Sequence, residues 1–93
     1  GSQSLLPVKE AKITLYPNPA TEVAILSVTS TTDQEVTLML EDLSGKVMCS
    51  FPVQIVKGTN EVSVDLKNVI SGTYLIYIIE MQGIASKKIV VAH

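Results

Sequence analysis

The sequence predicts an all-β domain, an antiparallel sandwich of about seven strands, with a barrel as the alternative. Three observations support this prediction. Apolar and polar residues alternate with a period of two in several runs, as they do in strands with one buried face. Val, Ile and Thr are frequent in these runs. Turn-forming residues separate the runs at short intervals, as in sandwiches and barrels.

The predicted strands follow one another along most of the chain. They cover residues 12–16, 22–30, 35–42, 46–56, 60–66, 72–80 and 84–92. Residues 1–11 carry no sustained period and include Pro7, so we expect a linker or lead-in there, with Gly1-Ser2 resembling the remnant of a cloning tag. The 93 residues are therefore predicted to hold one domain, residues 12–93.

Turn residues predict how the strands connect. Glycines in 43–46 and 57–60 predict hairpins on both sides of the run 46–56, and Met81-Gln82-Gly83 predicts the last hairpin. The segment 66–71 is too long for a tight hairpin and predicts a crossover between two sheets.

Two runs carry special patterns. Pro52 cannot donate to a ladder, so the run 46–56 is predicted to be an edge strand or to carry a bulge there. Its inward face is predicted to hold Val47, Cys49, Phe51, Val53 and Ile55. The run 72–80 is apolar on both faces, with Tyr74, Ile76 and Ile78 on one and Leu75, Tyr77 and Ile79 on the other. This pattern is typical of a central strand covered by its neighbours or by the lead-in, and an exposed stripe that binds a partner or a second copy is the alternative.

Composition argues against several functions. The formal net charge is −2 and Arg is absent, so the chain offers neither a basic field for nucleic acid nor a guanidinium for phosphate. Glu41 and Asp42 are adjacent on a strand and point to opposite faces, which separates them as catalytic carboxylates. The only His, His93, is at the end of the chain, and Cys49 is predicted to be a small core residue, with an intermolecular disulfide as the alternative. We expect no catalytic, metal-binding or cofactor-binding residues.

Three short motifs stand out, and each has a structural explanation. Pro17-Asn18-Pro19 predicts a rigid, extended corner before the second strand. Gly72-Thr73-Tyr74 follows the crossover and predicts a tyrosine corner, in which the hydroxyl bonds back to the backbone. Lys87-Lys88 places cations on opposite faces of the last strand, which protects an edge from aggregation.

In this order the motifs resemble the C-terminal sorting domain of the type IX (Por) secretion system, of type A. The resemblance covers residues 12–92. It is carried by Tyr16-Pro17-Asn18-Pro19-Ala20, the hairpin 43–47, Gly72-Thr73-Tyr74-Leu75-Ile76 and the ending Lys87–Val91. It implies an immunoglobulin-like β-sandwich that acts as a secretion address and places recognition on a defined set of residues. These residues are Pro17, Asn18, Pro19, Gly72, Tyr74, Lys87, Lys88, Ile89, Val90 and Val91.

The resemblance also implies partners and a route. An N-terminal cargo domain would cross the periplasm and then the outer membrane through the type IX translocon. A sortase-like cysteine peptidase would remove the address, with cleavage in or near residues 1–11, and leave the cargo at the cell surface or secreted. Addition of the last strand to a receptor sheet is one hypothesis for recognition. Ala92-His93 extends beyond the strand, where the resemblance implies that the strand itself ends the protein.

The alternative function is an immunoglobulin-like adhesion, carbohydrate-binding or spacer module of an extracellular protein. The chain has no Trp, one Phe and three Tyr, which argues against a sugar-stacking platform but leaves adhesion and spacing open. A homodimer through the apolar stripe also stays open.

Overall fold

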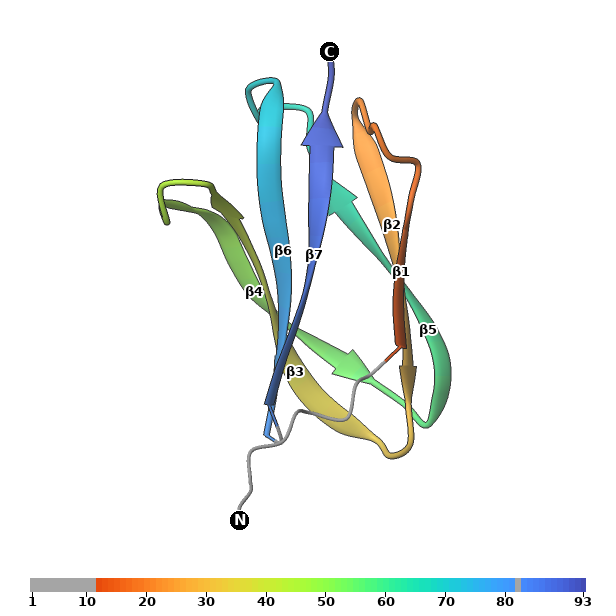
Figure 1. The fold of residues 1–93 in the computed structure, drawn as a ribbon. Coiled ribbons are helices and arrows are strands. Elements are labelled where there is room, and N and C mark those ends of the chain that lie inside the picture. The colour runs from red at the N-terminus through yellow and green to blue at the C-terminus, as the bar shows by residue number, and fades with distance from the viewer. Residues whose placement is uncertain (1–11, 82) are drawn as a thin grey trace.

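The computed structural model describes residues 12–81 and 83–93, which form two antiparallel sheets packed face to face (Figure 1). The strands are β1 (Lys12–Tyr16), β2 (Val23–Ser30), β3 (Gln34–Asp42), β4 (Val47–Ile55), β5 (Gly58–Asp65), β6 (Gly72–Glu80) and β7 (Gly83–Val91). One sheet has the order β1-β2-β5 and the other the order β4-β3-β6-β7. The described residues contain no helix, and so none that could span a bilayer. The predicted all-β sandwich is confirmed.

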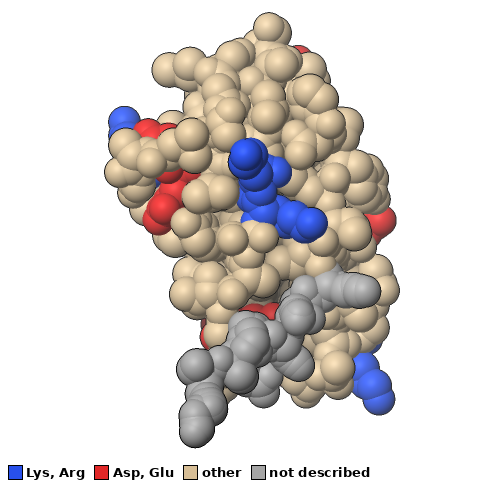
Figure 2. All heavy atoms as spheres, viewed as in Figure 1, with Lys and Arg blue, Asp and Glu red and all other residues tan. Residues whose placement is uncertain are grey.

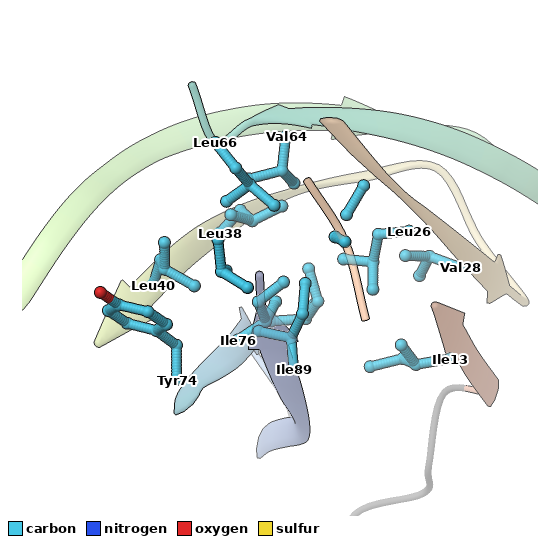
Figure 3. Packing of buried hydrophobic residues seen from close by; sticks show 14 of the residues in the cluster. Ile13, Leu26, Val28, Leu38, Leu40, Val64, Leu66, Tyr74, Ile76 and Ile89 are labelled. Carbon is cyan, nitrogen blue, oxygen red and sulfur yellow. The ribbon is translucent and has the colours of Figure 1, made fainter. Parts of the chain in front are cut away.

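The core fills the space between the sheets, and alternating residues of the strands build it (Figure 3). Leu38 and Leu40 of β3 and Ile76 of β6 point toward Leu26 of β2 and Val64 of β5, and all five are buried. Their spacing of two along each strand is the periodicity that predicted strands from the sequence.

Three predicted connections agree with the topology. β3 and β4 pair as a hairpin around 43–46, and β6 and β7 pair up to Glu80 and Gly83, although Gln82 lies outside the described residues. β5 and β6 belong to different sheets, so 66–71 is the predicted crossover. Its turn is closed by the Val69 amide, which donates to the Leu66 carbonyl at 3.0 Å.

The hairpin predicted at 57–60 is wrong. β4 pairs only with β3, whereas β5 pairs with β2 in the other sheet, so this segment crosses between the sheets. The Asn60 side chain organises the reversal, because it accepts from the Val56 amide and donates to the Val56 carbonyl, both at 2.9 Å. Gly58 has a φ of +106°, which serves this crossover as well as it would serve a hairpin turn.

β4 is an edge strand as predicted, but its irregularity lies away from Pro52. Cys49 pairs with Leu40 and Val47 pairs with Glu41, so Met48 is the extra residue of a bulge. The bulge turns Val47 outward, where it is 47% exposed, and corrects its predicted inward position. Cys49 is half-buried against the core, and this burial raises the pKa of its thiol.

β6 is the central strand that its double apolar pattern predicted, because it lies between β3 and β7. Tyr74, Ile76 and Ile78 are buried between the sheets. Leu75, Tyr77 and Ile79 lie on the outer face and are half-buried.

Candidate functional site

The antiparallel strands give the domain two ends of different composition. β1 and β7 run in the same direction and lie side by side, so Tyr16 and Val91 finish at one end, with the end of the chain (Figure 1). We call this end the carboxyl pole; it also holds the connections 17–22, 43–46 and 66–71. The opposite end, the amino pole, holds the start of β1 and the connections 31–33 and 56–57.

Residues 17–20, which we call the strap, lie along the outer edge of β7 at the carboxyl pole. The Ala20 amide donates to the Val90 carbonyl, and the Ala92 amide donates to the Ala20 carbonyl, both at 2.8 Å. Ala20 and Val91 thus form a parallel bridge, and both side chains are buried. The early proline motif and the terminal motif, more than sixty residues apart, are hydrogen-bonded neighbours.

Asn18 adds a second connection between the strap and β7. Its Oδ1 accepts from the Val90 amide at 2.9 Å, and its Nδ2 donates to the Lys88 carbonyl at 3.3 Å. One side-chain amide therefore satisfies two backbone groups on the edge of β7 that faces away from β6. Pro17 and Pro19, on either side of Asn18, are exposed, and both follow cis peptide bonds where the sequence predicted an extended corner.

Tyr16 fixes the start of the strap. Its hydroxyl donates to Glu61 Oε2 at 2.7 Å, which joins the end of β1 to β5 across β2. This hydrogen bond to a carboxylate raises the pKa of Tyr16, because ionising the phenol would lose the bond and place two negative charges together.

The Gly72-Thr73-Tyr74 motif lies on the other edge of the same segment of β7. Gly72 pairs with Val91 and Tyr74 pairs with Ile89. The Tyr74 hydroxyl donates to the Ile70 carbonyl, which is the geometry of the predicted tyrosine corner. The structure therefore brings the three motifs together, with the last residues of β7 held between the other two.

The five residues of the terminal motif divide into two groups. Ile89 and Val91 are buried in the core, whereas Lys87, Lys88 and Val90 are exposed. Lys87 pairs with Ile76 and Lys88 with Leu75, so the two ammonium groups leave opposite faces of β7 as predicted. Figure 2 shows lysine side chains gathered over β7, with the acidic side chains of that view lying apart from them.

His93 is fixed to the crossover, a contact that the sequence did not predict. The His93 amide donates to Ser71 Oγ at 3.0 Å, and His93 Nε2 lies 2.6 Å from the Val69 carbonyl oxygen. Together with the bond from Ala92 to Ala20, these contacts hold the two residues after β7 between the strap and the crossover.

The 43–47 hairpin shares the carboxyl pole but lies on the β3–β4 side of the sheet, away from β7. Asp42 orders it, because its Oδ1 accepts from the Ser44 hydroxyl at 2.7 Å and from the Ser44 and Lys46 amides at 2.9 Å. These hydrogen bonds, the one from the Ser44 hydroxyl foremost, lower the pKa of Asp42. Among the described residues, no group of three His, Cys, Asp or Glu is arranged to hold a metal ion.

The occupied edge argues against simple strand addition at the end of β7, and that hypothesis stays untested. A receptor strand would need free backbone groups on β7, yet the Lys88 carbonyl, both polar groups of Val90 and the Ala92 amide are already bonded to the strap. The outer edge from Lys88 to Ala92 is therefore closed in the folded domain.

Comparison with known proteins decides the family. The family model described as the secretion system C-terminal sorting domain matches residues 14–92, nearly the whole described chain. The chain belongs to this family. It is therefore a sorting signal for type IX secretion, and the family is non-catalytic.

A solved structure shares the fold. Dimeric latent PorU from Porphyromonas gingivalis superposes with a TM-score of 0.67 at 23% identity, over 88% of this chain and 9% of the PorU chain. A β-glucosidase from Listeria innocua aligns with 90% of this chain and 16% of its own, at a TM-score of 0.46 and 11% identity. The chain thus spans a small part of each protein. Comparison with curated protein sequences finds no match.

Proposed function

We propose that this sorting domain is the translocation address of a larger secreted protein, and that the type IX machinery binds it at the carboxyl pole around the end of β7. The observation that carries the proposal is the convergence of the three motifs, since the strap and Gly72–Tyr74 flank the terminal motif on its two edges. The convergence places exposed residues of the strap and of β7 beside one another on one surface, together with Gly72.

The direction of the chain supports the same pole. Strand β1 begins at Lys12, at the amino pole. A cargo that precedes the domain would therefore be joined to it at the end opposite to the motifs. A receptor bound at the carboxyl pole would meet the address without the cargo in its way. The cleavage site that separates cargo from address is proposed within residues 1–11, for a sortase-like cysteine peptidase at the outer membrane.

The chemistry of the exposed residues indicates the kind of receptor surface. Lys87 and Lys88 are point charges that pair with carboxylates, and Val90 between the buried Ile89 and Val91 offers a small apolar contact. The cargo would cross the periplasm, engage an acidic receptor surface at the outer membrane and end at the cell surface or outside the cell.

Export of a reporter tests this function. A periplasm-directed fluorescent protein fused before residues 12–93 is expected to reach the surface of a type IX-competent bacterium and to stay in the periplasm of a translocon-deficient host. Lys88→Glu is expected to lower surface reporter several-fold, because it places a carboxylate against an acidic receptor. Lys57→Glu makes the same charge change at the amino pole and is expected to export normally.

Two results would contradict the proposal. A folded wild-type fusion that remains in the periplasm would favour an adhesion or spacer module. Equal losses from Lys88→Glu and Lys57→Glu would show that export depends on net charge and not on the carboxyl pole.

A further inference from the structure

The edge of β7 differs from an ordinary sheet edge because a distant segment closes it. Edge strands commonly leave a row of amide and carbonyl groups for water or for another strand. Here the strap engages the Lys88 carbonyl, the Val90 amide, the Val90 carbonyl and the Ala92 amide. A receptor that binds the folded domain at this edge would contact side chains of the strap and of β7. The backbone groups between these two segments are already hydrogen-bonded to each other.

The strap is anchored at one residue and exposed at the others. Ala20 is fully buried between the sheets, whereas Pro17, Asn18 and Pro19 are on the surface. The Val90 amide donates to Asn18 and the Val90 carbonyl accepts from Ala20. Val90 is 37% exposed, and Lys88 is exposed as well. The strap and the end of β7 thus present one continuous surface made of two segments.

We propose that the secretion machinery recognises this closed edge as a folded, two-segment surface, in which the side chains of Pro17, Pro19, Lys88 and Val90 are bound together and Asn18 is the positioning residue. The inference rests on the proposed function and adds to it the mode of binding. The matching partner is a protein surface that combines carboxylates for the lysine with shallow apolar contacts for the prolines and the valine.

The role of Asn18 follows from the cost of ordering a chain end. Without its two hydrogen bonds, the strap and the last residues of β7 would move more freely and would have to be ordered again on binding. A preorganised surface avoids that loss of affinity. A net hydrogen bond of this kind corresponds to about a fivefold change in an equilibrium constant, so loss of the Asn18 side chain is expected to weaken recognition about fivefold to twentyfold.

Asn60 offers a matched control at the amino pole. Its side chain also joins backbone groups, accepting from the Val56 amide and donating to the carbonyls of Val56, Gly58 and, on β2, Val28. Asn60→Ala removes at least as many hydrogen bonds as Asn18→Ala but leaves the strap and β7 intact. The two variants therefore separate loss of stability from loss of recognition.

The test measures surface export of the reporter fusion together with chemical unfolding of each purified domain. Surface export of Asn18→Ala is expected to be about fivefold or more below that of Asn60→Ala. The unfolding midpoint of Asn18→Ala is expected to be no lower than that of Asn60→Ala. Asn18→Asp provides a second variant, because it keeps the acceptor for Val90 but turns an oxygen toward the Lys88 carbonyl, and it is expected to lower export as well. If both Asn18 variants export as well as Asn60→Ala, the inference is wrong, while export of the wild-type fusion would still uphold the proposed function.

Amide exchange distinguishes a closed edge from strand addition. The Ala20 amide, bonded to the Val90 carbonyl, is expected to stay protected when the domain binds detergent-solubilised type IX outer-membrane complex. Faster exchange at Ala20 in that complex would show that the strap opens for a receptor strand and would overturn the inference.

Discussion

The two poles of the domain are ordered by the same kind of contact, but the contacts join different parts of the chain. At the amino pole, Asn60 bonds the backbone at Val56 and Gly58, a few residues away, and the Val28 carbonyl on the paired strand β2, and so fixes the connection between β4 and β5 to its own sheet. At the carboxyl pole, Asn18 bonds Lys88 and Val90, 70 and 72 residues away. The same side-chain chemistry stabilises a loop at one pole and joins the strap to the last strand at the other.

The two poles differ in which parts of the chain their contacts join, more than in the kinds of residue that make them. Apart from Lys87 and Lys88, the residues of the three motifs at the carboxyl pole are prolines, an asparagine, a glycine, a threonine, a tyrosine and aliphatic residues, which are common in any β-sandwich. What distinguishes the pole is that three separate segments meet on β7. Variants matched between the poles therefore give the most informative tests.

The largest expected effect comes from the buried part of the terminal motif. Ile89→Ala is expected to lower the free energy of unfolding by about 2–5 kcal/mol, because Ile89 is fully buried between the sheets. Ile55→Ala removes an equally buried isoleucine at the amino pole, and a similar loss is expected. Chemical denaturation measures both, and export is expected to fall in parallel with stability. A much larger export defect in Ile89→Ala at equal stability would show that export depends on how Ile89 positions the end of β7, beyond its contribution to stability.

The next largest effect is expected from glycine substitutions, which should change the free energy of unfolding by different amounts at the two poles. Gly58→Ala at the amino pole is expected to cost about 1–2 kcal/mol, since its φ of +106° strains an L-residue. In Gly72→Ala, the new Cβ would meet no atom closer than 3.7 Å, and stability is expected to change by less than about 0.5 kcal/mol. If Gly72→Ala nevertheless loses export, the glycine serves the receptor contact; a large loss of stability would contradict the packing described here.

The tyrosine corner gives a smaller effect. Tyr74→Phe removes the hydrogen bond to the Ile70 carbonyl and is expected to lower the free energy of unfolding by about 1 kcal/mol. Tyr77→Phe, on the outer face of the same strand, removes a hydroxyl that bonds to no other side chain or backbone group among the described residues, and is expected to be nearly neutral. Equal unfolding midpoints for the two variants would show that the corner adds no stability.

The smallest effect is a pH dependence confined to the 43–46 turn. The pKa of Asp42 is lowered from its ordinary 3.8 by hydrogen bonds to the ionised carboxylate. The contribution of these bonds is therefore complete above the ordinary value and is lost as the pH falls through the lowered folded value. Amide exchange at Ser44 and Lys46, corrected for intrinsic rates, is expected to accelerate from about pH 5 to about pH 2, and Asp42→Asn to abolish the change. An unchanged profile in the variant would contradict this assignment.

Much of the fold was predictable because its signals are local. Alternation in β3 and β5, the doubled apolar pattern of β6 and the crossover at 66–71 each depend on a short stretch of sequence. The tyrosine corner was predictable for the same reason, because Tyr74 bonds only four residues back. The edge position of β4 followed from Pro52, which lacks an amide to donate.

The errors arose where the outcome depends on distant partners. Gly58 signals a chain reversal, but the sequence around it does not say whether β5 returns to β4 or crosses to β2. Val47 points outward because of the bulge at Met48. That bulge arises from the pairing of β4 with β3, which the local sequence does not reveal. The motif residues were identified, but Asn18 carried no local sign that its side chain would bond β7. A polar side chain between two prolines, with no backbone partner nearby, is the only signal that could have suggested a distant contact.

Recognition at the carboxyl pole can be tested by comparing the contacts that the two poles make during export. A photo-crosslinking amino acid would replace Val90 at the carboxyl pole or Met81, which is 91% exposed, at the amino pole. In a type IX-competent bacterium, crosslinks are expected from position 90 to an outer-membrane component of the secretion system and none from position 81. Crosslinks from position 81 alone, or equal crosslinks from both, would contradict recognition at the carboxyl pole.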